Sequence, residues 1–128
     1  MSEGVSVILR AGDYESAHYA LALAAAALAV SKPAVLFFTM SGIRALQGKP
    51  PALIGWERDA ENRKRGVGDY ETLLEACVEL GCRFIVCEMG LRSLDIDAKS
   101  LRDDVPFTVA GIVTLLEETK PGMHLVSL

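Results

Sequence analysis

The sequence predicts an α/β fold, a three-layer sandwich in which helices cover a mostly parallel sheet of four or five strands. Short, continuous apolar runs that suit buried parallel strands alternate along the chain with segments of helical periodicity. Hydrophobic residues make up 51% of the chain and charged residues 23%, as a packed globule requires. The length of 128 residues fits one domain, and no internal repeat suggests a second.

Composition and charge exclude several classes of function. A net charge of −4 argues against nucleic-acid binding, which needs a basic surface. The most apolar window, residues 19–30, is shorter than the roughly 20 residues that cross a bilayer, so we expect no membrane span. Three cysteines, an odd number, and no visible secretory signal favour reduced thiols and a cytoplasmic location.

The first half of the chain alternates between strand and helix patterns. Residues 14–30 are predicted to form a helix with Asp13 as its N-cap, and Lys32-Pro33 ends it. This helix is apolar nearly all round, which predicts burial on more than one side, by the sheet and neighbouring helices or by a subunit interface. The other elements predicted here are a strand at 5–9, a strand at 34–39, a turn at 40–42 and a short helix at 43–47.

Residues 48–68 differ from the rest, because they show no sustained period and contain Pro50-Pro51. We expect an inserted loop, functional or mobile, and the mixed charges between Arg58 and Arg65 are most simply a solvated run. A helix then follows at 70–80, with Asp69 as its N-cap.

From residue 81 onward, the sequence predicts shorter strands and helices separated by a polar loop. Gly81 is the expected C′ residue of the preceding helix. The predicted elements are a strand at 83–87, a short helix at 88–94, a polar loop at 95–104, a short strand near Val105, a helix at 108–119 and a strand at 123–127. The residues expected on the core face of the helix at 108–119 are Val109, Ile112, Val113 and Leu116.

Cys87 is the leading candidate for chemistry, because it ends an apolar strand where a new helical turn begins. In open α/β sheets, ligands gather at the carboxyl ends of the strands. A following turn that aims its backbone N–H groups at the sulfur would lower the pKa of the thiol and make the thiolate available. The neighbouring Glu88 opposes this, and Arg83 and Arg92 are the cations that would offset it.

Cys77 and Cys82 have simpler interpretations. Cys77 falls on the apolar stripe of its helix, so packing in the core is favoured, with a resolving role for Cys87 as the alternative. Cys82 lies at the opposite end of its strand from Cys87, which argues against a bond between the two and favours a structural role.

Metal and phosphate sites have weak support. His18 and His124 lie far apart in sequence and no C-x-x-C spacing occurs, so we expect no metal site. No glycine-rich phosphate loop follows either early strand, and we expect no cofactor, although the turns at Gly12 and Gly42 can still offer N–H groups to an anion. His18 is expected to be a packed or surface residue, with proton transfer as the alternative. Asp13, in the loop between the first strand and the first helix, is expected to cap that helix, with proton transfer or ligand binding at the site as the alternative.

Several motifs of the sequence resemble those of the DsrE/DsrF-like family, over nearly the whole chain. These motifs are Phe37-Phe38-Thr39 followed by Gly42, then Leu73-Leu74-Glu75-Ala76-Cys77, Gly81, and Phe84-Ile85-Val86-Cys87-Glu88-Met89. The resemblance is strongest to small single-domain members described as sulfur carriers or, loosely, as peroxiredoxin-like. It implies a Rossmann-like, flavodoxin-like sandwich of five strands, homo-oligomers, and a cysteine that carries sulfane sulfur.

On this resemblance, Cys87 corresponds to the sulfur-carrying cysteine and Cys77 to a second cysteine found in some members. The pocket around the cysteine departs from the family pattern: Met89 is kept, Gly90-Leu91 follow it, and Met40-Ser41 replace an aromatic pair. The resemblance therefore predicts the fold more firmly than the function.

The sequence thus predicts a sulfur carrier or sulfurtransferase-like protein that holds a persulfide on Cys87 and exchanges sulfur with donor and acceptor thiols, on proteins or small molecules. The alternative is a non-catalytic, homo-oligomeric binding module that kept the fold and lost the chemistry. Thiol peroxidase activity is disfavoured, because residues 83–86 lack the Pro and the Thr or Ser that precede a peroxidatic cysteine.

Overall fold

The computed structural model describes residues 3–128 and has a parallel sheet at its centre. Within the described residues the sheet has five strands in the order β4-β3-β2-β1-β5, and every neighbouring pair is parallel. The strands are β1 (Gly4–Leu9), β2 (Ala34–Phe38), β3 (Arg83–Cys87), β4 (Phe107–Ala110) and β5 (Met123–Ser127). The predicted α/β sandwich is confirmed. Four strands, β1, β2, β3 and β5, lie at or close to their predicted positions, whereas β4 occupies 107–110, where the last helix was expected to begin.

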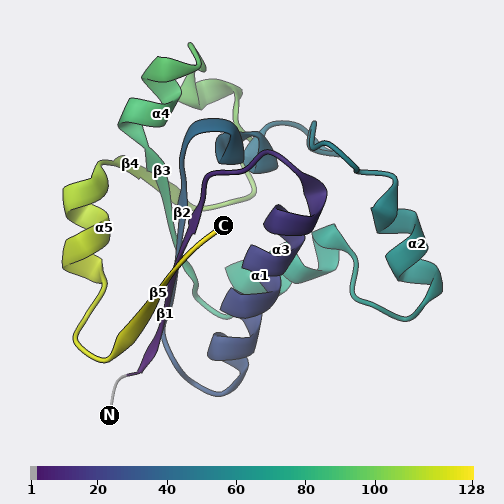
Figure 1. The fold of residues 1–128 in the computed structure, drawn as a ribbon, viewed down its shortest axis with the longest axis horizontal. Helices are drawn as coiled ribbons and strands as arrows, with labels where there is room; N and C mark the ends of the chain where they lie inside the picture. Colours follow the sequence, from purple (N-terminus) through teal and green to yellow (C-terminus); the bar gives the residue numbers. More distant parts are fainter. Residues whose placement is uncertain (1–2) are drawn as a thin grey trace.

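Helices cover both faces of the sheet (Figure 1). The long helices α1 (Tyr14–Ala29) and α3 (Tyr70–Glu79) lie side by side on one face, and the short helix α5 (Ile112–Glu118) covers the other. The remaining helical segments are the 3₁₀ segment η1 (Met40–Leu46), α2 (Arg58–Lys64), α4 (Glu88–Ser93) and the 3₁₀ segment η2 (Ala98–Ser100). The chain moves outward from β1 to β4 and then returns through α5 to β5, so the strand order reverses beside β1.

The core is divided unequally between the two faces of the sheet. Alternate residues of the central strands point to opposite faces, as in any strand. Phe84 and Val86 of β3 join the large cluster under α1 and α3, whereas Ile85 and Cys87 join a small one. The fully buried members of this small cluster are Val35, Phe37, Ile85, Cys87 and Leu115.

The expectation of a solvated loop at 48–68 is wrong for its second half. Residues 58–64 form α2, and Asp59 in this helix is buried. Its carboxylate accepts hydrogen bonds from the Tyr14 hydroxyl at 2.6 Å and from the Tyr70 backbone N–H at 2.8 Å. Trp56 packs edge-on against both tyrosine rings. Asp59 thus anchors the charged run to the core, because its buried carboxylate accepts hydrogen bonds from residues on two different helices.

The phase predicted for the last helix is also wrong. The chain first forms β4 up to Ala110, so the helix begins only at Ile112. Leu115 is its one fully buried residue. The four residues expected in the core, Val109, Ile112, Val113 and Leu116, are instead 41–71% exposed. A helix this short can turn only one residue deeply into the sheet, and the apolar pattern alone does not say which.

The apolar helix α1 is buried on one side and against its neighbour. Ala17, Leu21 and Ala24 face the sheet and α3, while Tyr19 on the outer side is 59% exposed. The first of the two predicted arrangements, sheet plus neighbouring helix, therefore accounts for its buried face. Among residues 3–128, no helix combines the length and apolarity needed to cross a bilayer.

Candidate functional site

Cys87 is the last residue of β3 and the N-cap of α4, as predicted. It has no exposed surface, and it belongs to the small core cluster with Phe37 and Leu115. Its side chain makes no capping hydrogen bond with α4, so the expected alignment of turn N–H groups on the sulfur is absent from this conformation. Burial and position, not helix capping, define the environment of this thiol.

The charged residues near β3 separate into two places. Glu88, which follows Cys87, pairs with Arg92 at 3.3 Å on the surface, so one of the two expected cations does offset it. Arg83 lies at the other end of the strand, where it holds Glu118 at 2.9 Å and the Thr108 hydroxyl at 2.8 Å. Arg83 is therefore occupied elsewhere and does not serve the thiol.

An apolar crevice of about 250 Å³ opens beside Cys87, at the carboxyl ends of β5, β1 and β2. This is the edge at which the strand order reverses, where open α/β sheets usually bind ligands. Phe37 and Leu115 belong both to the crevice lining and to the cluster around Cys87. The complete lining is Ile8, Arg10, Phe37, Thr39, Met40, Met89, Ile112, Leu115 and Ser127.

Met40 and Met89, both predicted site residues, lie together on this crevice although they come from different elements. Gly90 makes the approach possible, since a side chain there would come within 2.6 Å of the Met40 backbone nitrogen. The glycine that departs from the family motif therefore lets α4 pack against the start of η1. Polarizable methionine sulfurs suit a site for sulfur chemistry.

Of the two turns predicted to offer N–H groups to an anion, the one at Gly42 has a structural role instead. The N–H of Gly42 donates to the Thr39 carbonyl at 2.9 Å and to the Arg10 carbonyl at 3.0 Å, so it is not free for an anion. Any side chain at Gly42 would overlap the Leu9 backbone. Gly12 approaches Ser41 closely, since a Cβ at Gly12 would lie only 3.0 Å from the Ser41 Cβ. These residues pack two turns together above β1 and β2.

Cys77 and Cys82 lie on the opposite face of the sheet from Cys87, in the large core. The structure therefore does not bring Cys77 and Cys87 together. The Cys77 thiol donates to the Leu21 carbonyl at 3.5 Å, and Cys82 to the Ala34 carbonyl at 3.6 Å. The hydrogen bond between the Cys82 and Cys77 thiols, together with burial, raises the pKa of Cys82 and keeps the Cys82 thiol protonated.

The end of α3 explains why these two cysteines meet. Gly81 has a φ of +84°, and the Cys82 N–H donates to the Cys77 carbonyl at 2.9 Å. The Gly81 N–H donates to the Val78 carbonyl at 3.2 Å, which completes a Schellman C-cap. This motif commonly sets the side chains at its two ends against each other. The predicted C′ glycine and the structural interpretation of Cys82 fit this geometry.

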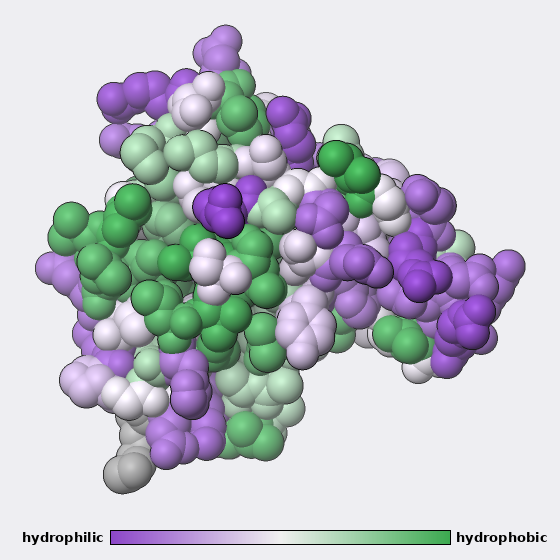
Figure 2. Space-filling view, viewed as in Figure 1, coloured by the Kyte–Doolittle hydropathy of each residue, from purple (hydrophilic) through white to green (hydrophobic). Residues whose placement is uncertain are grey.

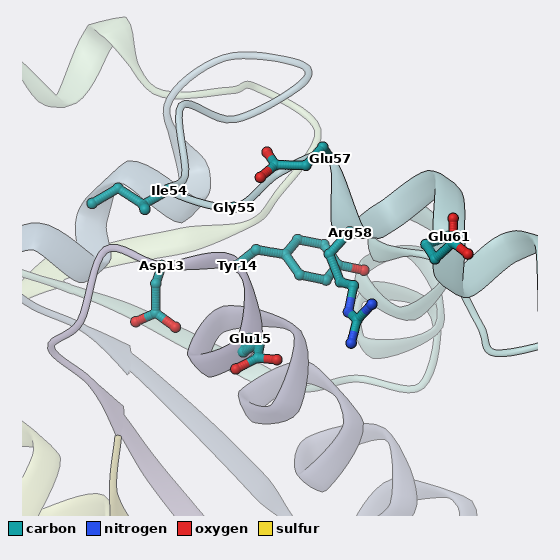
Figure 3. A pocket seen from close by; sticks show the side chains of 8 residues that line it. All are labelled: Asp13, Tyr14, Glu15, Ile54, Gly55, Glu57, Arg58 and Glu61. Carbon is teal, nitrogen blue, oxygen red and sulfur yellow. The ribbon is translucent and has the colours of Figure 1, made fainter.

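Asp13 lies in another region, where it lines a hollow of about 550 Å³ between the start of α1 and α2 (Figure 3). His18 lines a second hollow next to it, which also includes Asp13. The Asp13 carboxylate accepts the Ser16 N–H at 3.0 Å, which is a capping role. The Tyr14 N–H donates to the Ile54 carbonyl at 2.7 Å, so the docked segment 48–68 occupies this helix end. His18 Nε2 lies 2.7 Å from the Gly68 carbonyl and thus donates its proton there, away from Cys87.

Arg10, Phe37 and Leu115 are site residues that the sequence analysis missed. Arg10 has a sequence signal, because it directly follows a buried strand and so lies at the ligand-binding edge of the sheet. Phe37 and Leu115 look like ordinary core residues in the sequence, and only packing places them between the crevice and the thiol. No group of three or more His, Cys, Asp or Glu side chains suited to a metal ion occurs in residues 3–128.

The fold and this crevice define an α/β sandwich with a buried cysteine at the carboxyl end of β3 and an apolar crevice at the same edge of its sheet. The model of the DsrE/DsrF-like family matches residues 4–128, essentially the whole chain, and the protein belongs to this family. The family is generally linked to sulfur relay. A comparison with curated proteins gave no significant match.

Proposed function

We propose that this protein is a sulfur carrier or sulfurtransferase-like protein that holds sulfane sulfur as a persulfide on Cys87. The observation that carries the proposal is the position of this cysteine at the carboxyl end of β3, in a core cluster that shares Phe37 and Leu115 with the lining of a crevice flanked by Met40 and Met89. Membership of a family linked to sulfur relay supports it. Cys77 and Cys82 are not part of the proposed site, since they belong to the core of the other face.

The chemistry is an exchange between sulfur atoms. The Cys87 thiolate attacks the outer sulfur of a donor, a new S–S bond forms, and the old S–S bond breaks as the donor leaves with the electron pair. An acceptor thiolate then attacks the outer sulfur of the persulfide and releases Cys87 as a thiolate. No net oxidant or reductant is consumed. The apolar crevice excludes water from the persulfide during its lifetime.

Exchange requires access to a thiol that is fully buried in this conformation. The cover is thin, because α5 has seven residues and only Leu115 is fully buried. Displacement of Leu115 or Phe37 is the expected route from the crevice to Cys87, since both residues line the crevice and belong to the core cluster of Cys87. We propose that donor binding includes this movement.

A second candidate is a non-catalytic, homo-oligomeric binding module of the same fold. The full burial of Cys87 and the absence of a capping hydrogen bond on its side chain favour this alternative. It predicts that Cys87 stays inert to alkylation and to sulfur donors in the folded protein, whereas the carrier predicts reaction at this residue.

Intact-mass spectrometry after incubation with polysulfide separates the two candidates. For a carrier, the wild type gains mass in steps of one sulfur atom, Cys87→Ser does not, and Cys77→Ala, the matched control from the other core, still does. Equal loading of wild type and Cys87→Ser, or of neither, would remove Cys87 from the mechanism and leave the binding module. Far-UV circular dichroism verifies that each variant is folded.

We propose further that the protein self-associates, in the cytoplasm, through the surface around α5. Figure 2 shows hydrophobic side chains gathered over α5 and the neighbouring sheet, whereas the region of α2 is mostly hydrophilic. Val113 is 71% exposed and Leu116 57%. Sedimentation velocity should show an oligomer for the wild type and a monomer for Val113→Lys; a monomeric wild type at tens of micromolar would contradict self-association.

A further inference from the structure

Arg10 is the one charged side chain in the lining of the crevice, which shares Phe37 and Leu115 with the core cluster of Cys87. Its backbone is held on both sides, since its N–H donates to the Leu128 carbonyl at 2.8 Å and its carbonyl accepts the Gly42 N–H at 3.0 Å. The side chain itself is exposed. The base of this arginine is thus fixed at the rim while the guanidinium is free to meet a ligand.

Within residues 3–128, no carboxylate lies within 4.0 Å of the Arg10 guanidinium. Three other arginines, in β3 and in the segments that follow it, form ion pairs: Arg83 with Glu118, Arg92 with Glu88, and Arg102 with Glu71 and Asp104. An unpaired guanidinium over an otherwise uncharged lining makes the crevice selective for an anion.

We propose that the crevice takes a small anionic sulfane donor, whose anionic group pairs with Arg10 while its outer sulfur points to Cys87. This inference rests on the proposed sulfur-carrier function and names its substrate class. A volume of about 250 Å³ is below that of most ligand pockets, which suits a donor of inorganic or amino-acid size. Thiosulfate and the persulfide of a free amino acid share this chemistry, an anion beside a sulfane sulfur.

Thiosulfate illustrates how the step balances. Cys87 loses its proton to solvent, and its thiolate attacks the outer sulfur of thiosulfate. The new S–S bond forms as the S–S bond of thiosulfate breaks, and sulfite leaves with the electron pair of that bond. Arg10 holds the sulfonate oxygens in the ground state and stabilises the charge that grows on them as sulfite departs.

The first test measures the rate of sulfur loading on Cys87 by intact mass, with thiosulfate, cysteine persulfide and the uncharged diallyl trisulfide. Arg10→Gln should lower the rate with an anionic donor by about tenfold or more, and leave the rate with diallyl trisulfide within about twofold. Arg58→Gln, an exposed arginine at the hollow on the other face, is the matched control and should behave as wild type.

Salt and a conservative variant add two independent readouts. Raising the ionic strength should slow wild-type loading from the anionic donor and have little effect on Arg10→Gln. Arg10→Lys should restore part of the rate, since it restores the charge without the bidentate geometry. A loss confined to thiosulfate assigns an inorganic donor, and one confined to cysteine persulfide an amino-acid donor. Equal rates for Arg10→Gln and wild type with both anions, or an equal loss with all three donors, would overturn the inference.

A binding measurement separates this inference from the proposed function. In Cys87→Ser, which cannot form a persulfide, thiosulfate should shift the NMR signal of the Arg10 Nε–H saturably, and Arg10→Gln in the same background should bind no thiosulfate. Binding without any sulfur loading of the wild type would refute the carrier function and keep the anion site. Loading of the wild type without thiosulfate or cysteine persulfide binding to Cys87→Ser would refute the anion site alone.

Discussion

The two faces of the sheet bury cysteines of equal exposure in very different surroundings. Cys77 and Cys87 are both fully buried. Cys77 belongs to the 10-residue α3 and packs toward the 16-residue α1, where its thiol donates a hydrogen bond to the Leu21 carbonyl. Cys87 lies beneath the seven-residue α5, next to a crevice. We refer to these as the thick face and the thin face.

The difference shows that fractional exposure alone does not identify a working thiol. What matters is the depth of the cover and how many groups must move to remove it. On the thick face, α2 and the segment before it are docked by the buried Asp59 and add a further layer. On the thin face, Leu115 is the only residue that the short helix α5 buries in the core cluster of Cys87. Local opening is therefore expected on the thin face first.

Removing the anchor of the thick face is expected to destabilise the protein strongly. Asp59→Ala leaves the buried Tyr70 N–H without its partner and Tyr14 with only Asn62, so we expect a loss of about 3 kcal/mol in the free energy of unfolding. Glu61→Ala, on the same helix but in a surface pair with Arg65, should cost at most about 0.5 kcal/mol. Urea denaturation measures both, and equal costs would show that α2 is only loosely attached.

Matched leucine truncations compare the two faces directly. Leu21 and Leu115 are each 1% exposed. Leu21→Ala should cost about 4 kcal/mol and Leu115→Ala about 2 kcal/mol, because the thin cover relaxes more easily into the space left. Only Leu115→Ala should speed alkylation of Cys87 by iodoacetamide in the folded protein, followed by peptide mass spectrometry. Faster labelling of Cys77 than of Cys87 in wild type would reverse the comparison.

Two glycines at helix ends allow a smaller test of backbone strain on each face. A Cβ added at Gly81 or at Gly111 meets no atom within 4 Å, but Gly81 has a φ of +84° and Gly111 a φ of −107°. Gly81→Ala should therefore cost about 1 kcal/mol by straining the cap that joins Cys77 to Cys82. Gly111→Ala should stay within about 0.5 kcal/mol of wild type. Thermal and urea unfolding measure both costs. If steric crowding by the added Cβ were the cause, the two variants would be equally stable, because neither Cβ meets an atom within 4 Å.

The smallest effect is a pH dependence that belongs to the thick face. Hydrogen bonds from Thr72, and then Arg63, lower the pKa of Asp69 from 3.8 to about 2, and hydrogen bonds from Arg102 lower that of Asp104 to about 2. Because the folded state binds these protons less readily, this stabilisation is present above pH 4 and lost as the pH falls toward 2. Asp69→Asn should flatten the curve of unfolding free energy against pH over that interval. An unchanged slope would assign the acid sensitivity to other groups.

The candidate site was partly predictable from the sequence. The apolar pattern predicts Cys87 at a strand end, and the family resemblance points to Met40 and Met89. The structure confirms the strand end and brings the two methionines together on one crevice. Gly42, one of the two predicted turn glycines, instead has a packing role, because close backbone approach and ligand binding select the same residue.

The sequence by itself determined the strands, the long helices and their caps, because these follow from local periodicity and from short-range hydrogen bonds such as those of Asp13 and Asp69. Only the tertiary structure decided which cysteine lies under the thin cover, which face of α5 is buried, and that Arg10 meets Met89 across the crevice. These relations join residues far apart in the chain. They depend on strand order and on which helix covers which face of the sheet. The local pattern of apolar and polar residues predicts neither of these.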